Sequence, residues 1–502
     1  TTSTKMNHLH LSSSWLLLLL LLLLLHLLCT AAGGEHHSGM QLPLFGQVGP
    51  GWVREIYRQR LDHFSYTPKM DSEFFHQRYL VNTRYWNSSG WNGKPPIIVY
   101  TGGEWDITED LEGEAYLMHV ASRSGALVVY MEHRYYGESN PFGSHDEAYM
   151  NSSTLGYLSV AQALADFAEI TMHVMKSHCP IATCPVIATG CSYGGMVAAW
   201  FRLKYPHLVV GALASSAPVL FPNGKLVSRP GFYDTISRVF RDVSRLCYDT
   251  IKASWAAMDQ YANKVDTSVF QSFFNICDPY NGVEDLKIFL YRMYNTMTQY
   301  DDPFDPKPER FCRGVTKART ADVLSRLKAG LDEYYPNQPC LNLTITENNP
   351  TVGLNNRIIE LSPGTTLGWE WQKCTEMIFP IGSHGNITMF ETFYYDYVAD
   401  RDECWRKNRV MPRPQWIPTT FNISSHLDGF AGNIIFSNGL RDPYSSEGVL
   451  SDISSTIIAL VTQRGSHCTD MNAPRPDDPQ WLIDQRKREM SIMEGWIMNY
   501  IP

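Results

Sequence analysis

One segment decides the fold: Pro185-Val-Ile-Ala-Thr-Gly-Cys-Ser-Tyr-Gly-Gly-Met-Val-Ala-Ala-Trp200. It predicts a short apolar strand, an abrupt turn over residues 190–194 and then a helix, which is the setting that a G-x-S-x-G nucleophile elbow requires. Glycines belong at Gly190 and Gly194, because side chains there would collide with the neighbouring strand and helix. We therefore predict that Ser192 is a nucleophile. The alternative is a glycine-rich turn in which this serine has no chemical role.

A serine hydroxyl is a weak nucleophile near neutral pH, so it needs a histidine base and a carboxylate that orients the base. In sheet hydrolases the carboxylate and then the histidine follow the serine along the chain, on loops after later strands. Asp442 and His467 fit this order, because each follows an apolar run, at 433–437 and 456–461. The alternative for Asp442 is an Asx-turn residue before Pro443, and the alternative for His467 is a histidine of a surface loop.

Backbone amides beside the elbow are predicted to form an oxyanion hole. The N–H groups of Tyr193 and of Gly103, in the glycine turn after an early apolar run, are the expected donors. The alternative is that the glycine turn is only a flexible loop with no part in an oxyanion hole. His133 is a rival base, although its place after an early strand favours a structural role.

Short apolar runs that end in glycine or polar turns are typical of buried parallel strands. They lie at 96–100, 126–131, 185–189, 209–214, 433–437 and 456–461, with a helical pattern at 159–175. This alternation predicts an α/β fold with a doubly wound parallel sheet. Strand patterns stop between Phe221 and Ser362, where amphipathic helices are predicted at 232–245, 251–261, 284–298 and 321–335. The expected division is a leader and signal peptide (1–33), a sheet domain in two parts (42–220 and 363–502) and an inserted helical cap (221–362) that covers the active site.

Composition limits the partners and the compartment. A net charge of −9 and the lack of a basic cluster argue against a nucleic-acid partner. The leucine run from Leu16 to Leu25, followed by small residues, predicts a secretory signal peptide and no membrane contact after its removal. The oligomeric state stays open, with a homodimer among the options.

Cysteines and glycosylation sequons agree with that route. Ten cysteines follow Cys29, most are expected to pair in an oxidising compartment, and none has the C-x-x-C spacing of a zinc site. We predict no metal and no cofactor. The N-x-[ST] sequons lie at Asn87, Asn151, Asn342, Asn386 and Asn422.

Six patterns, the elbow among them, resemble one family of serine peptidases. They are Gly190-x-Ser-Tyr-Gly-Gly-Met196, Ala199-Trp-Phe-Arg-x-Lys-Tyr-Pro206, Ala214-Ser-Ser-Ala-Pro218, Glu132-His-Arg-Tyr-Tyr-Gly-Glu-Ser139, Gly368-Trp-Glu-Trp-Gln-x-Cys374 and Phe436-Ser-Asn-Gly-x-x-Asp-Pro443. From about Leu61 to Pro502 the chain resembles the lysosomal Pro-X carboxypeptidase and dipeptidyl peptidase II family, with plant-type Pro-X carboxypeptidases closest. The resemblance implies an α/β-hydrolase domain interrupted by a helical, disulfide-containing cap. It also implies a triad of Ser192, Asp442 and His467 that cleaves next to proline.

The sequence departs from the family's pattern at three places. Cys191 stands where the family usually has glycine, and Tyr444 stands where tryptophan is common after Asp-Pro. The segment Gly465-Ser-His-Cys-Thr-Asp470 lacks the usual paired histidines and resembles the thymus-specific serine protease branch. We expect Met196 and Tyr444 to line the proline pocket, while core packing is the alternative for Met196.

The leading interpretation is a serine exopeptidase that acts on peptides with proline at the P1 position. It is expected to release a C-terminal residue from peptides ending in Pro-X through an acyl-enzyme on Ser192, in a vacuole or lysosome or outside the cell. The alternatives are the release of N-terminal X-Pro dipeptides, as dipeptidyl peptidase II does, and a serine esterase or lipase. A catalytically silent binding protein on a hydrolase scaffold is the alternative from another class.

Overall fold

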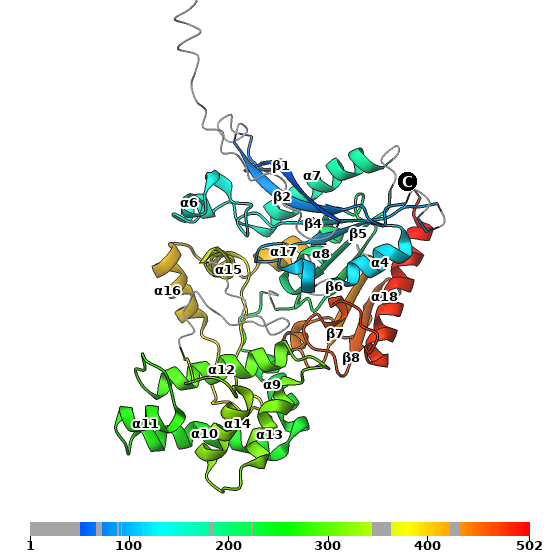
Figure 1. Cartoon of the computed structure of the whole chain (residues 1–502). Coiled ribbons are helices and arrows are strands. Elements are labelled where there is room, and N and C mark those ends of the chain that lie inside the picture. The colour runs from blue at the N-terminus through cyan, green and yellow to red at the C-terminus, as the bar shows by residue number, and fades with distance from the viewer. Residues whose placement is uncertain are drawn as a thin grey trace, which may run out of the picture. The chain divides into compact units, whose positions relative to one another are not determined.

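The strand of the elbow lies inside a sheet of eight strands, counted over the described residues, in the order β1-β2-β4-β3-β5-β6-β7-β8 (Figure 1). Their bounds are Trp52–Arg60 (β1), Phe74–Asn82 (β2), Ile97–Thr101 (β3), Leu127–Met131 (β4), Val186–Cys191 (β5), Gly211–Ser215 (β6), Ile434–Gly439 (β7) and Ile457–Thr462 (β8). From β4 to β8 every pairing in this order is parallel. The six apolar runs of the sequence are these parallel strands, which confirms the predicted α/β-hydrolase fold.

The computed structural model describes residues 51–66, 73–87, 90–91, 93–113, 115–179, 184–221, 224–343, 363–421 and 432–501. All of them belong to one unit, Gln47–Pro502. The expected leader and signal peptide (1–33) falls outside the described residues. Within the described part, no helix has both the length and the apolar character that a membrane crossing requires.

The strands β1 and β2 have no counterpart among the sequence predictions. They pair with each other in antiparallel fashion, and β2 pairs antiparallel with β4, so this edge of the sheet is mixed. β1 is the outermost strand, and only Trp52 and Gln59 of its residues are buried. Because an exposed edge strand carries few apolar residues, its pattern in the sequence is weak.

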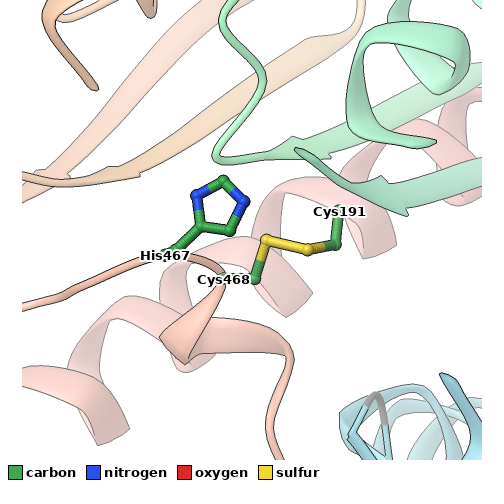
Figure 2. Close-up of side chains that lie close together, drawn as sticks. All are labelled: Cys191, His467 and Cys468. Carbon is green, nitrogen blue, oxygen red and sulfur yellow. A yellow bond between two sulfur atoms is a disulfide. The ribbon is translucent and has the colours of Figure 1, made fainter. Parts of the chain in front are cut away.

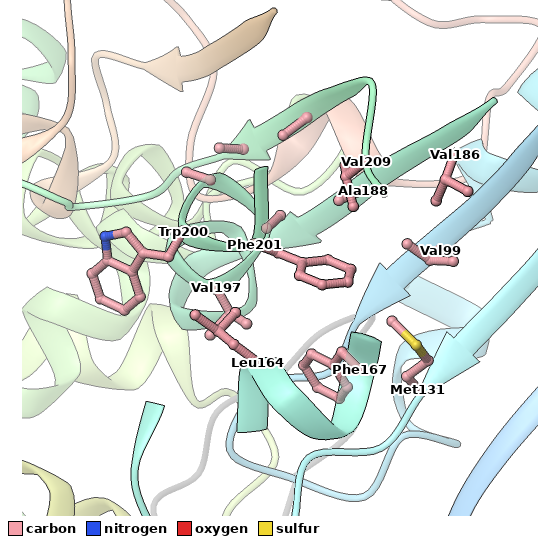
Figure 3. Packing of buried hydrophobic residues seen from close by; sticks show 14 of the residues in the cluster. Val99, Met131, Leu164, Phe167, Val186, Ala188, Val197, Trp200, Phe201 and Val209 are labelled. Atoms are coloured by element: carbon pink, nitrogen blue, oxygen red, sulfur yellow. The ribbon is translucent and has the colours of Figure 1, made fainter. Parts of the chain in front are cut away.

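Helices cover both faces of the sheet and make two separate cores. Apart from the group in the next paragraph, the described helices are α3 (Asp110–Gly113), α4 (Tyr116–Ser124), α5 (His145–Ala148), α6 (Ser152–Leu155), α7 (Val160–His178), α8 (Ser192–Lys204), α15 (Pro363–Thr375), α16 (Tyr397–Asn408), α17 (Trp416–Phe421) and α18 (Gln480–Asn499). On one face, Val99 packs with Phe167 of α7 and Phe201 of α8 (Figure 3). On the other face, Ile98 belongs to a cluster with Met493 of α18. Successive strand residues point to opposite faces, so one strand supplies both cores.

Within residues 224–343, which the structure describes without a gap, the regular elements are all helices. They are α9 (Gly231–Val243), α10 (Arg245–Ala262), α11 (Thr267–Phe274), α12 (Val283–Gln299), α13 (Lys307–Lys317) and α14 (Val323–Tyr334), shown in green in Figure 1. They enclose a hydrophobic cluster of their own, in which Phe240 and Tyr294 are fully buried. Met389 and Phe390, from later in the chain, join this cluster. The domain boundaries given above stay a prediction.

All ten described cysteines are paired. The disulfides are Cys179–Cys184, Cys191–Cys468, Cys247–Cys312, Cys277–Cys340 and Cys374–Cys404. Pairing on this scale is typical of proteins that fold in an oxidising compartment, so the chain is a protein of the secretory pathway. Of the five sequons, Asn87, Asn151, Asn342 and Asn386 are exposed, and Asn422 falls outside the described residues. Their glycosylation stays a prediction.

Candidate active site

Strand β5 ends at Cys191 and helix α8 begins at Ser192, with no loop between them. Ser192 has a φ angle of 56°, in the left-handed region that residues with a side chain seldom adopt. A Cβ atom at Gly190 would lie 2.3 Å from the carbonyl oxygen of Gly194, and one at Gly194 would lie 2.5 Å from that of Thr101. The turn therefore has the geometry of a nucleophile elbow. Ser192 is partly exposed, as a residue that meets a substrate must be.

The turn after β3 packs against this elbow. The hydroxyl of Thr101, the last residue of β3, donates a hydrogen bond of 2.7 Å to the carbonyl oxygen of Gly194. A Cβ atom at Gly103 would lie 3.8 Å from the backbone nitrogen of Gly194. The first N–H groups of a helix have no acceptor within the helix, and Tyr193 is the second residue of α8. The structure thus brings Gly103 next to Tyr193, and their role as oxyanion donors stays a prediction.

Asp442 and His467 meet at the carboxyl ends of β7 and β8. Nδ1 of His467 lies 2.7 Å from Oδ2 of Asp442, and both side chains are buried. Oδ1 of Asp442 accepts a hydrogen bond of 2.9 Å from the backbone N–H of Tyr444, where a short 3₁₀ helix (η4, Pro443–Glu447) begins. Both carboxylate oxygens of Asp442 are therefore engaged, which fixes its orientation toward the imidazole.

A disulfide joins the elbow to the loop of this histidine. Cys191 precedes Ser192 and Cys468 follows His467, and the Cα atoms of the two cysteines lie 5.8 Å apart. Figure 2 shows the imidazole of His467 beside this bond at the end of β5. The serine, the histidine and the aspartate that the sequence predicts as a triad are thus gathered at one edge of the sheet. Their catalytic roles stay a prediction.

A model of the serine carboxypeptidase S28 family matches residues 59–489 of this chain. The chain belongs to the S28 family. It is 35% identical to the lysosomal Pro-X carboxypeptidase of Mus musculus over 466 residues, 88% of this chain and 89% of that protein. It is 34% identical to the Homo sapiens protein of the same name over 464 residues, 88% of each chain. It is 26% identical to the thymus-specific serine protease of Homo sapiens over 466 residues, 89% of this chain and 86% of that protein.

Membership of S28 makes the chain a serine-type peptidase and confirms the family resemblance seen in the sequence. The helical region of this S28 peptidase reaches the histidine directly. The backbone N–H of His467 donates a hydrogen bond of 3.0 Å to the carbonyl oxygen of Gln299, at the end of α12. The ring of Tyr300 stands at right angles to the imidazole, with 6.1 Å between centroids. Sequence reasoning missed both contacts, because the pattern of α12 shows only an amphipathic helix.

The two residues expected to line the proline pocket lie in different surroundings. The ring of Tyr444 is partly exposed, 5.4 Å from the imidazole of His467 and 5.0 Å from the ring of Phe232 of α9. Met196 is 1% exposed and packs in the core between the sheet and α8. Tyr444 therefore lies beside His467, and Met196 lies where the packing alternative puts it. Their part in substrate binding stays a prediction.

His133, the rival base, has both ring nitrogens occupied. Burial lowers its pKa to about 4, so the imidazole is neutral. Nδ1 lies 2.8 Å from the carbonyl oxygen of Arg134, to which it donates, and Nε2 accepts from the hydroxyl of Tyr193 at 3.0 Å. The amide of Gln372 donates to the same hydroxyl at 2.7 Å. His133 thus holds the side chain of Tyr193, which favours its structural role.

One carboxyl group in the site was not expected from the sequence. Glu104 directly follows Gly103, and its Oε2 atom is excluded from solvent with no hydrogen-bond partner among the described residues. Burial raises the pKa of Glu104 to about 7, while the charge of His467 acts in the opposite direction. The group also interacts electrostatically with Tyr300 and Tyr444. A titratable acid therefore lies among the residues that surround the triad.

Cys191, Cys468 and His467 also form a group whose ligand atoms all lie within 4.8 Å of one another. A thiolate is the form of cysteine that binds metal ions. Because these two sulfur atoms are bonded to each other, neither is a thiolate. In the oxidised protein the group is a covalent link and not a set of metal ligands.

Proposed function

We propose that this S28 peptidase cleaves next to proline and releases the C-terminal residue of peptides that end in Pro-X. The observation that carries the proposal is the buried pair of Asp442 and His467, joined through a disulfide to the elbow of Ser192. The likeness to two proteins named Pro-X carboxypeptidase supports proline at the P1 position.

The chemistry follows from the positions of these groups. Oγ of Ser192 attacks the carbonyl carbon of the P1 residue while Nε2 of His467 takes the hydroxyl proton. Asp442 keeps Nδ1 protonated and stabilises the imidazolium that forms. The N–H groups of Tyr193 and Gly103 donate to the oxyanion. The proton on Nε2 then passes to the leaving nitrogen, and water hydrolyses the acyl-enzyme with His467 again as the base.

The proline ring needs a small apolar pocket beside the serine. Tyr444 offers an aromatic surface next to His467, and the rings of Phe221 and Phe232 stand edge-on to it at 6.3 and 5.0 Å. Since Phe232 belongs to α9, the helical region supplies part of this surface. Met196 belongs to the elbow helix α8 and packs into the core cluster.

The end of the substrate that the enzyme holds decides between two reactions. A terminal carboxylate needs a hydrogen-bond donor or a positive charge, whereas a terminal amine needs an acid. A protonated Glu104 is such a donor, and its pKa of about 7 keeps it protonated in an acidic compartment. An ionised Glu104 would instead favour an amine, so release of an N-terminal X-Pro dipeptide is the second candidate.

An acidic lysosome or vacuole is the compartment that fits this proposal. Two of the three relatives named above, from Mus musculus and Homo sapiens, carry the word lysosomal in their names. Peptides with free termini are abundant where proteins are degraded. Secretion from the cell is the alternative destination.

Two reporter substrates separate the candidates. We expect hydrolysis of a peptide blocked at its N-terminus and ending in Pro-Phe, with phenylalanine released, and no hydrolysis of an unblocked Lys-Pro amide. The reverse result establishes the dipeptidyl peptidase, and turnover of a simple ester alone establishes an esterase. A fluorophosphonate probe should label the wild type and fail to label Ser192→Ala. Equal labelling of the two proteins would remove Ser192 from the mechanism.

A further inference from the structure

Of the five described disulfides, Cys191–Cys468 is the one whose cysteines are the chain neighbours of Ser192 and His467. Its first cysteine directly precedes Ser192 and its second directly follows His467, although the two are 277 residues apart in sequence. Both cysteines are buried, at 6% and 5% exposure. The bond therefore links the residue next to the proposed nucleophile directly to the residue next to the proposed base.

Left-handed backbone conformations occur at Cys468, one end of this link, and at Ser192, the residue after the other end. Ser192 has a φ angle of 56° and Cys468 one of 53°. A left-handed conformation is unfavourable for a residue with a side chain and persists only where the surroundings hold it. The disulfide holds the chain immediately beside Ser192 and at Cys468 itself.

Hydrogen bonds hold the segment of His467 from other sides. The N–H of Cys468 donates to the hydroxyl of Ser216 at 2.9 Å, the N–H of His467 donates to Gln299, and the imidazole binds Asp442. These contacts anchor the segment to the residue after β6, to α12 and to the loop after β7. The disulfide adds an anchor to β5 and α8, where the serine is.

We propose that Cys191 and Cys468 are positioning residues, whose disulfide sets the distance and orientation between the Ser192 hydroxyl and the His467 imidazole. The proposal rests on the proposed function of those two residues. An error of about 1 Å in the placement of reacting groups is enough to slow a reaction about 10²-fold. Hydrogen bonds can lengthen or exchange partners, whereas the covalent bridge keeps the backbones at Cys191 and Cys468 within the reach of a disulfide.

The link is also reducible by a dithiol. One thiolate of the reductant attacks a sulfur of the bridge, and a mixed disulfide forms as the other cysteine leaves as a thiolate. The second thiol of the reductant then closes its own disulfide and releases the first cysteine. Two electrons pass from the dithiol to the protein, and the cysteines end as two thiols. Reduction should therefore loosen the contact between serine and histidine.

A second disulfide provides a matched control on the same strand. Cys184 lies just before β5 begins, and its partner Cys179 lies just after α7 ends. This bond is therefore at the amino end of β5, and Cys191 is at the carboxyl end, where the triad gathers. Removing either bond deletes one bridge from the same strand, but only one of them touches the elbow.

The experiment compares the wild type with the double variants Cys191→Ala/Cys468→Ala and Cys179→Ala/Cys184→Ala. We expect the first variant to lose about 10- to 100-fold in kcat on the blocked Pro-Phe peptide, with KM within about twofold of the wild type. Its rate of labelling by the fluorophosphonate probe should fall in parallel. The control variant should keep kcat and KM even where its Tm is lower. Unchanged kcat in the first variant, or an equal loss in both, would overturn the proposal.

Two further measurements keep the outcome decisive. If the first variant does not fold, the folded wild type is reduced with a dithiol, and the activity lost is compared with the thiols alkylated at Cys191 and Cys468 by mass spectrometry. Activity that stays constant while both thiols appear contradicts the proposal, and recovery on reoxidation supports it. Failure of the proposed function is distinct, because the wild type itself would then show no labelling or hydrolysis that depends on Ser192.

Discussion

Nδ1 of His467 lies 2.7 Å from Oδ2 of Asp442, while the second oxygen of that carboxylate accepts from the N–H of Tyr444. The carboxylate can therefore turn away from the imidazole only by breaking a backbone hydrogen bond at the start of η4. This arrangement leaves Nε2 of His467 as the basic nitrogen. It is the relationship on which the proposed reaction depends most directly.

The first prediction replaces Asp442 by asparagine. An amide that donates to Nδ1 would force the proton onto Nε2, so the imidazole could not accept from Ser192. We expect kcat on the blocked Pro-Phe peptide to fall about 10⁴-fold, with a small change in KM. Steady-state kinetics measure this, and Asp402→Asn on the exposed side of α16 is the control. A loss below about tenfold would show that Asp442 does not orient the base.

The second prediction concerns Glu104, whose pKa burial raises to about 7. Below about pH 7 its neutral carboxyl can donate to the substrate's carboxylate, and above it two negative charges repel each other. KM for the blocked Pro-Phe peptide should therefore rise as the pH passes through about 7. Glu104→Gln keeps a donor and cannot ionise, so its KM should stay level over that range.

The opposite pH dependence would identify a different partner for Glu104. If KM for an unblocked Lys-Pro substrate falls as the pH rises, and Glu104→Gln weakens that substrate at every pH, the carboxylate binds an amine. The dipeptidyl peptidase reaction would then replace the carboxypeptidase reaction.

The third prediction concerns stability and pH. Glu376 is 1% exposed, its Oε1 accepts from the N–H of Val160 at 2.8 Å, and burial raises its pKa to about 7. An unfolded glutamate has a pKa of about 4.3, so between these values the folded state keeps a proton that the unfolded state loses. This contribution to the free energy of unfolding is complete below about pH 4.3 and is lost as the pH rises through about 7.

Glu376→Gln should remove that dependence. At about pH 7.5 the variant should be more stable than the wild type by about 1 to 3 kcal/mol, and at about pH 4.5 the two should be nearly equal. Urea unfolding at the two pH values measures the difference, with the exposed Glu494→Gln as the control. The expectation is contradicted if the wild type is equally stable at the two pH values and Glu376→Gln is less stable than the wild type at both.

The fourth prediction is that Cys191, Cys468 and His467 bind zinc once the disulfide is reduced. Reduction would turn Cys191 and Cys468 into thiols beside His467, and in the oxidised protein the ligand atoms of these three residues lie within 4.8 Å of one another. Two cysteines and one histidine form a set that binds zinc, with a fourth position for water. Micromolar Zn²⁺ should therefore inhibit the enzyme after reduction by a phosphine, and a chelator should restore the activity. If zinc inhibits the oxidised enzyme to the same degree, the inhibitory zinc site is not this group. The same conclusion holds if zinc inhibits the Cys191→Ala/Cys468→Ala variant after reduction.

The positions of the triad could be predicted because two simple rules fix them. The carboxyl ends of parallel strands meet at one edge of a sheet, and Ser192, Asp442 and His467 each follow an apolar run. Five of the six parallel strands stood out because all of their residues are buried, and β8 stood out by its apolar residues although only Ile457 of it is buried. β1 did not stand out, because only two of its nine residues are buried.

The contacts that complete the site could not be predicted in this way. The partner of Cys191 is 277 residues away, and spacing does not determine how ten cysteines pair. The approach of Gln299 to His467 depends on how the helical region packs, which the amphipathic pattern of α12 does not encode. The burial of Glu104 depends on side chains from several elements. Each of these is a long-range relationship that no local pattern in the sequence records.

The bond between Cys191 and Cys468 also decides what a cut in the chain would do. A protease that severs one peptide bond anywhere between Ser192 and His467 would produce two fragments that the bridge still holds together. The N-terminal fragment would contain Cys191 and Ser192, and the C-terminal fragment would contain His467 and Cys468. Such a nicked enzyme would migrate as one species on a non-reducing gel and as two after reduction, so the cleavage could pass unnoticed in an oxidised sample.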